Sequence, residues 1–209
     1  MEPAKKHYNQ CSPLSSRRQT NLAVIESEND SLQLDGGPLG LLSFSRSGER
    51  YLHRWSFPDS TVTLDSVESG LEEAWPSSPP LQQIHSQSFA DGREVIFGVG
   101  MAGRGHWSAS FTLVPDLKCW IVELACRSSV AAEKLSSTYQ WMAEGVDPLA
   151  DQDACPEAIA LDSSGKITLE AIAPSSVASI ASQQIRFHPL QIGEGASTTQ
   201  WAFRLRVEV

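Results

Sequence analysis

The chain contains no long apolar run. Its apolar segments stay well short of the roughly 20 consecutive residues that a membrane-spanning helix needs, and residues 1–21 lack the apolar stretch of a signal peptide. The sequence therefore excludes a helical membrane protein, and we expect a cytoplasmic protein that does not bind membranes.

Cysteine is also scarce, with four residues in the whole chain: Cys11, Cys119, Cys126 and Cys155. They form no Cys-x-x-Cys pair and have no histidine at a zinc-site spacing, so we expect no metal site. Cys119 and Cys126 fall on one predicted strand at odd spacing and therefore face opposite sides of it. They cannot bridge each other, and we expect both to be buried free thiols.

Positive charge is the third shortage. The chain has 16 Lys and Arg residues against 25 Asp and Glu, a net charge of −9. Residues 1–20 hold four of these basic residues against one acid, so the rest of the chain is more acidic still. An acidic body repels phosphate, so we expect no nucleic-acid binding by it. We interpret residues 1–20 as a disordered basic tail and residues 21–209 as a single antiparallel β domain.

Short segments of alternating apolar and polar residues fill most of that domain. They are separated by turn-forming sequences such as Asp91-Gly92 and Pro115-Asp116, and neither an internal repeat nor a long amphipathic helix occurs. This pattern is typical of an all-β protein. We predict an antiparallel β-sandwich with one or two short helices, and a closed antiparallel β-barrel as the alternative.

Several local expectations follow from the pattern. A turn after Phe57 predicts a hairpin with Trp55 opposite Leu64 and Arg54 opposite Asp65. His53 alternates with Trp55, so we expect it in the core. Further along the chain, residues 175–184 favour a short helix, and Pro189 restricts residues 185–192 to an edge strand at best. Trp201–Val209 alternates as a well-paired strand, while residues 129–143 have no clear preference and could cover a neighbouring face.

The segment Glu94–Arg127 carries the most information about function. A turn at Pro115-Asp116 predicts a hairpin in which Trp107 lies opposite Cys126 on the core face and His106 lies opposite Arg127 on the other face. A shift of one residue would mix apolar and polar residues on both faces. The polar face is therefore the one place where the sequence brings several chemically capable groups together.

A third strand precedes these two. The loop Gly103-Arg104-Gly105 predicts a three-residue hairpin that places Ala102 opposite His106. In this register the preceding glycines join the polar face and leave room above it. The candidate ligand-binding residues are then Gly98, Gly100, Arg104, His106, Ser108, Ser110, Glu123 and Arg127.

Glycines 98, 100 and 103 also match the Gly-x-Gly-x-x-Gly string of dinucleotide-binding proteins. That fingerprint requires the glycines to open a helix, whereas here they enter a tight turn followed by alternating residues. We therefore expect no cofactor.

Three function classes fit this face. The first, which we favour, is a binding module for a small polar ligand or a sugar, held by the cation of Arg127 and by small hydroxyl groups. The second is an enzyme, a hydrolase, isomerase or lyase, with His106 and Glu123 as candidate catalytic acid and base. The third is a structural or protein-interaction domain. The sequence leaves the ligand and the oligomeric state open.

Overall fold

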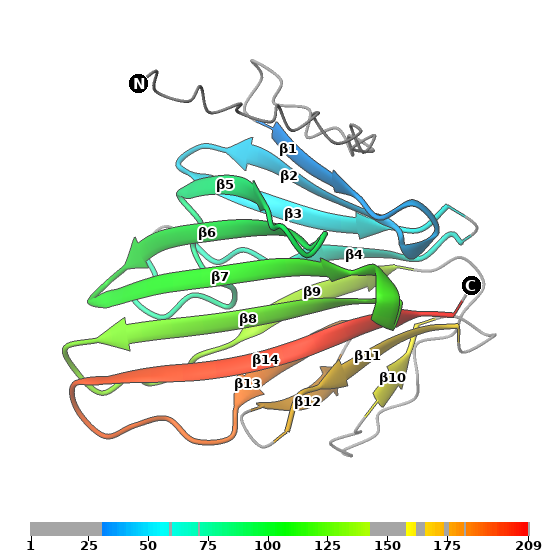
Figure 1. Ribbon diagram of the computed structural model, residues 1–209. Helices are drawn as coiled ribbons and strands as arrows, with labels where there is room; N and C mark the ends of the chain where they lie inside the picture. Colours follow the sequence, from blue (N-terminus) through cyan, green and yellow to red (C-terminus); the bar gives the residue numbers. More distant parts are fainter. Residues whose placement is uncertain are drawn as a thin grey trace, which may run out of the picture.

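The computed structural model describes residues 31–58, 60–70, 72–142, 158–161, 166–173, 176–181 and 183–208. Within these residues, two antiparallel sheets of seven strands lie face to face (Figure 1), and neither closes into a barrel. The predicted β-sandwich is confirmed, and the barrel alternative is wrong. The proposed tail, together with Cys11 and Cys155, lies outside the described residues.

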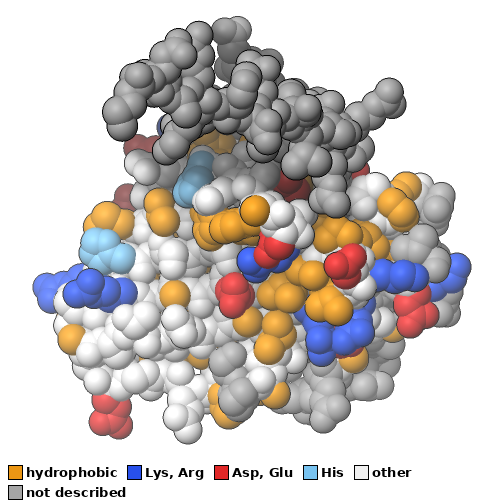
Figure 2. Space-filling model, viewed as in Figure 1, with side chains coloured by type: hydrophobic (Ala, Val, Ile, Leu, Met, Phe, Trp, Pro, Cys, Tyr) orange, Lys and Arg blue, Asp and Glu red, His pale blue; other side chains and the backbone are white. Residues whose placement is uncertain are grey.

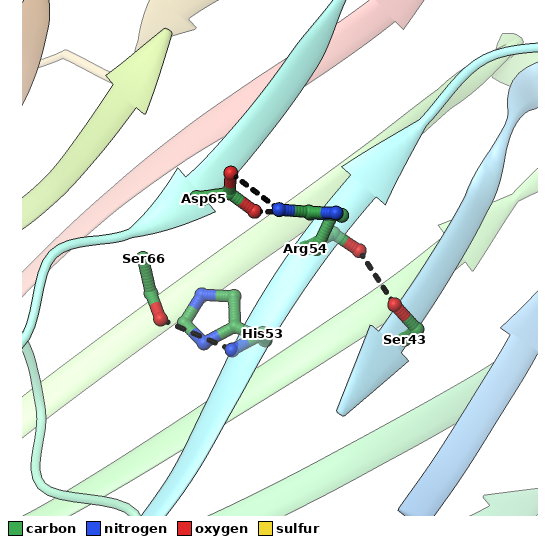
Figure 3. A network of polar contacts seen from close by, with 5 residues as sticks. All are labelled: Ser43, His53, Arg54, Asp65 and Ser66. Atoms are coloured by element: carbon green, nitrogen blue, oxygen red, sulfur yellow. Dashed lines mark hydrogen bonds and ion pairs between the residues drawn. The ribbon is translucent and has the colours of Figure 1, made fainter. Parts of the chain in front are cut away.

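Sheet A is built from both halves of the chain. Its strands, in spatial order, are β1 (Ser31–Asp35), β2 (Leu41–Ser47), β3 (Arg50–Ser56), β4 (Thr63–Ser66), β9 (Ser137–Met142), β13 (Gln184–Pro189) and β12 (Ser176–Ala181). Arg54 lies opposite Asp65 and Trp55 opposite Leu64, as the sequence predicts. On the outer face of this sheet the Arg54 guanidinium donates to Asp65, and Ser43 Oγ donates to the Arg54 carbonyl at 3.4 Å (Figure 3).

Sheet B contains the segment with the candidate site. Its strands, in spatial order, are β10 (Ala158–Ala160), β11 (Ile167–Ala171), β14 (Ser197–Val207), β8 (Cys119–Ser128), β7 (Gly105–Val114), β6 (Glu94–Ala102) and β5 (Gln83–Ser88). The long strands β6, β7, β8 and β14 form one continuous surface (Figure 1). The alternation predicted for the C-terminal strand is confirmed, since Trp201, Phe203 and Leu205 are all buried.

The inner faces of the two sheets share one hydrophobic cluster. Trp55, Trp107, Trp120 and Trp201 are among its largest fully buried side chains. Two of these indoles also connect the sheets by hydrogen bonds: Trp201 Nε1 donates to Ser137 Oγ of sheet A at 3.2 Å, and Trp120 Nε1 donates to the Leu39 carbonyl at 2.8 Å. Trp120 and Trp201 thus pack the core while satisfying their own donors, whereas the buried Nε1 atoms of Trp55 and Trp107 have no hydrogen-bond partner among the described residues.

Helical structure in the described residues is limited to two short 3₁₀ turns, η1 (Gly37–Leu39) and η2 (Pro115–Leu117). The helix predicted within residues 175–184 is wrong, because Ser176–Ala181 forms β12. There the small side chain of Ala178 lies opposite the buried ring of Phe187. The edge position predicted for residues 185–192 is also wrong. Strand β13 lies between β9 and β12, and Pro189 stands at its last position, where a missing N–H interrupts little of the ladder.

The later part of the ambiguous segment 129–143 does not cover the predicted polar face, and residue 143 lies outside the described residues. Residues 137–142 form β9 in sheet A, whereas the polar face belongs to sheet B. Cys119 and Cys126 are buried free thiols on opposite faces of β8, as predicted. Among the described residues, none lies in a helix long and apolar enough to cross a membrane.

Candidate functional site

The register predicted for the hairpin of β7 and β8 is confirmed. His106 lies opposite Arg127, and Ser110 lies opposite Glu123, on the outer face of sheet B. The inner partners, among them Trp107 and Cys126, are buried. The side chains of His106, Glu123 and Arg127 are exposed, so this part of the predicted face is open to ligands.

The register predicted between β6 and β7 is wrong by one residue. Ala102 pairs with Gly105 instead of His106, so the loop consists of Gly103 and Arg104 alone. Gly103 has a φ of 54°. A glycine with positive φ at the first loop position is what a two-residue type II′ hairpin turn requires, and this turn matches the twist of the flanking strands.

The shorter loop turns β6 over. Gly98 and Gly100 point into the sandwich, where they face residues 80–82 of the connection between the sheets. A Cβ atom on Gly100 would lie 1.6 Å from the Pro80 carbonyl oxygen, so only glycine fits there. The prediction that Gly98 and Gly100 line the polar face is therefore wrong. Their small size accommodates the approach of the chain's own backbone.

The outward residues of β6 are instead apolar. Phe97 is partly exposed, and Val99 and Met101 are 47% and 50% exposed. The ring of Phe97 stacks on His85 of β5, with 5.3 Å between centroids. The outer face of sheet B therefore combines an aromatic strip on β5 and β6 with a polar surface on β7, β8 and β14.

A shallow depression, here called the central pocket, lies where these two surfaces meet. Its volume is about 410 Å³, and its lining includes Phe97, Ser108, Ser110, Glu123, Ala125 and Gln200. Ser110 Oγ donates to Glu123 Oε2 at 3.2 Å, which orients the carboxylate. In Figure 2 much of this face is white, the colour of uncharged polar side chains and backbone, and hydrophobic side chains gather toward its right-hand half.

A second depression, here called the cationic pocket, lies at the end of the same strands. Its volume is about 700 Å³, and its lining includes Arg104, His106, Arg127, Ser129, Ser197 and Thr198. Blue and pale-blue side chains gather at this edge of the molecule, near the turn between β6 and β7 (Figure 2). Three of the predicted residues thus meet here, from the β6–β7 turn, from β7 and from β8.

The structure does not bring His106 and Glu123 into one pocket. Glu123 belongs to the central pocket, and His106 belongs to the cationic pocket. The two pockets are nevertheless neighbours, since Ser108 follows His106 by two residues on β7. Two strand residues span about 7 Å. A single elongated ligand can therefore reach both.

Phe97, Gln200 and Thr198 are site residues that the sequence interpretation missed. A register that turns Gly98 and Gly100 outward turns the alternate residue Phe97 inward, although the glycine at the start of the loop was the available signal for a two-residue turn. The alternation of the last strand already turned Gln200 outward. Its position beside β8 follows only from the sheet order, because Gln200 pairs with Ala125 across a long sequence separation.

Comparison with known proteins gives no relative: no family model, no curated protein and no solved structure matches the chain. Within the described ranges, no cluster of His, Cys, Asp and Glu side chains is arranged to hold a metal ion.

A separate titratable group lies inside the sandwich. His53 is 4% exposed, as expected of a core residue, and its ring packs against Phe44, Trp55 and Phe111. Its Nε2 atom forms a hydrogen bond with the hydroxyl of Tyr139 at 2.9 Å. Burial lowers the pKa of His53 to about 3, so the imidazole is neutral at physiological pH.

Glu68 lies near this histidine at the edge of the core. Ser66 Oγ donates to Glu68 Oε1 at 3.3 Å. The same Oγ atom accepts from the His53 backbone N–H at 3.0 Å (Figure 3). Burial raises the pKa of Glu68 to about 7, although the charge of Arg50 and the bond from Ser66 oppose the shift. The pockets described above do not include Glu68, so we assign this group to stability.

Proposed function

We propose that the protein binds a small polar ligand of carbohydrate type on the outer face of sheet B. The observation that carries this proposal is the central pocket, in which the ring of Phe97 adjoins Ser108, Ser110, Glu123 and Gln200. An aromatic surface beside a few fixed polar groups is the usual composition of a small-molecule site.

The chemistry of the polar groups suits a ligand rich in hydroxyl groups. Each serine hydroxyl both donates and accepts, the Gln200 amide does the same through two atoms, and a carboxylate has further lone pairs beyond the one that Ser110 uses. All of these side chains stand on strands, which hold them more rigidly than loops do. The site therefore needs little rearrangement to bind.

The two alternative functions have less support. Acid–base catalysis needs His106 and Glu123 in one cavity, and they line separate pockets. A structural or interaction domain would have its small residues covered by another layer of the chain. Gly98 and Gly100 are covered in this way, but Ser108 is exposed. A cytoplasmic location and the lack of nucleic-acid binding remain predictions from the sequence.

An array of neutral and acidic oligosaccharides, followed by calorimetry on the bound sugars, tests the proposal. We expect Phe97→Ala to weaken binding at least tenfold, since loss of an aromatic anchor costs on the order of 2 kcal/mol. The matched control is Phe89→Ala, because Phe89 lies under Arg93 in the β5–β6 turn, outside both pockets. Binding of no sugar, or equal loss in both variants, would contradict the proposal.

A further inference from the structure

We infer that the ligand is acidic and that its carboxylate or sulfate group binds in the cationic pocket. This inference rests on the proposed function, because it adds an anion subsite to a polar ligand whose body occupies the central pocket. The residues that carry it are Arg104, His106 and Arg127, which line one depression at the end of β7 and β8.

The first argument is the pairing of charges. Four arginines elsewhere on the described surface have acidic partners: Arg54 pairs with Asp65, Arg93 with Asp91, and Arg204 and Arg206 with Glu170. In the described part of the chain, Arg104 and Arg127 form no such ion pair, and the cationic pocket includes no acidic lining residue. In a chain of net charge −9, a pocket lined by two arginines and no acidic residue is a distinct local arrangement.

The second argument is the geometry of the donors. Arg127 and His106 are directly opposite each other on neighbouring strands, which places their Cβ atoms about 5 Å apart. Arg104 projects from the turn two residues before His106. Two guanidinium groups offer planar sets of N–H donors that match the oxygens of a carboxylate, sulfate or phosphate.

The third argument is the set of hydroxyl groups around these cations. Thr198 of β14 is the cross-strand neighbour of Arg127, and Ser129 and Ser197 complete the same wall. Hydroxyl donors add uncharged hydrogen bonds to an anion. Because the two pockets are lined by neighbouring positions of β7, β8 and β14, the acidic group belongs at one end of an elongated ligand.

Matched pairs of probes separate the acidic group from the sugar body. The first pair is trigalacturonate and its methyl ester, and the second is N-acetyllactosamine with and without a 6-sulfate. Calorimetry at low salt gives the affinity of each. We expect one acidic probe to bind at least tenfold more tightly than its neutral counterpart, since charge-assisted hydrogen bonds are about twice as strong as neutral ones. The pair that shows the difference identifies carboxylate or sulfate as the source.

The variant Arg104→Gln/Arg127→Gln locates the effect. It should reduce the affinity for the acidic probe to that of the neutral one, while the thermal midpoint of unfolding stays unchanged. The control Arg204→Gln/Arg206→Gln removes the same charge from the same sheet face, outside both pockets, and should leave the preference intact. Raising the salt concentration should weaken only the acidic probe.

The outcomes distinguish the inference from the proposed function. If no acidic probe binds more tightly than its neutral counterpart, or if both double variants lose the preference equally, the inference is overturned. The proposed function survives either result as long as a sugar binds and Phe97→Ala weakens it. A preference that only Arg104→Gln/Arg127→Gln removes establishes the anion subsite.

Discussion

Each end of the outer face of sheet B carries two arginines, but in the described residues the arginines form ion pairs with an acid at one end only. At one end, Arg204 and Arg206 of β14 share the carboxylate of Glu170 on β11, with 3.2 Å between Arg206 Nε and Glu170 Oε1. At the other end, Arg104 and Arg127 form no ion pair in the described residues, and no acidic residue lines the pocket around them. The paired end needs no ligand to satisfy its donors, whereas the unpaired end presents its donors to solvent.

This difference arises from single residues at equivalent places. On β11, Glu170 lies opposite Arg204 across the sheet. At the far end, Thr198 takes the corresponding position opposite Arg127. A cross-strand acid neutralises one end, and a hydroxyl leaves the other cationic. The same fold thus has a structural end and an end suited to binding.

The largest effect that we predict tests the strand register on which this comparison depends. Gly100→Ala would place a Cβ against the Pro80 carbonyl and should lower the free energy of unfolding by about 3 kcal/mol, the cost of overpacking. The neighbouring Val99→Ala changes an exposed side chain and should cost at most about 0.5 kcal/mol. Urea unfolding measures both. If Val99→Ala destabilised the protein more than Gly100→Ala, Val99 would face the core and Gly100 the solvent, as the sequence interpretation predicted.

The next prediction contrasts the exposed charges with a buried acid. Burial raises the pKa of Glu68 from 4.5 to about 7, so the stability that neutral Glu68 contributes is present below pH 4.5 and is lost as the pH rises through 7. Glu68→Gln abolishes this loss. Relative to the wild type, the variant should gain roughly 2 kcal/mol of unfolding free energy between pH 5 and pH 8.

The control for Glu68→Gln is Glu133→Gln, which removes an exposed carboxylate outside both pockets. Unfolding in urea at the two pH values measures the effect. A Glu68→Gln curve that runs parallel to the wild-type curve over this pH range would refute the assignment of Glu68 as an acid whose pKa is raised by burial at the edge of the core.

The third prediction converts the unpaired end into a copy of the paired end. Thr198→Glu places a carboxylate opposite Arg127, as Glu170 is placed opposite Arg204. Binding of the acidic probe should weaken about tenfold, or about 1.4 kcal/mol, while binding of the neutral counterpart stays the same. Thr168→Glu, on the same face beside Arg206, is the matched control. If Thr198→Glu kept the preference for the acidic probe unchanged, the unpaired charge of Arg127 would not be what binds the acidic group.

The sequence predicted what local periodicity controls. The sandwich, the pairing of His106 with Arg127 and the inward tryptophans all follow from alternation within one strand or across one short hairpin. The orientation of β6 could not be obtained in this way, because burying Val99 looked more favourable than burying Gly98. Residues 80–82, a non-regular segment, pack closely against the inward face of β6. Only glycines leave room for them there, so Gly98 and Gly100 face inward and Val99 faces solvent.

Some residues of the candidate site are likewise placed by local patterns, and others by strand pairing between distant parts of the chain. Arg104, His106 and Arg127 meet in one pocket because a single turn and a single hairpin place them together. Gln200 and Thr198 arrive from β14, more than 70 residues away in the chain, through a strand pairing that no local pattern specifies. His106 and Glu123 were grouped correctly on one face, but their division between two pockets depends on side-chain surroundings that only the full sheet defines.

The most direct test of ligand binding at the unpaired end is a map of amide chemical-shift changes as trigalacturonate or the 6-sulfated probe, whichever binds, is added to the isotopically labelled protein. We expect changes at Arg104, Arg127 and Thr198 together with Phe97 and Gln200, and none around Glu170. Changes centred on Arg204 and Arg206, or on sheet A, would contradict the claim that the unpaired end of sheet B binds the ligand.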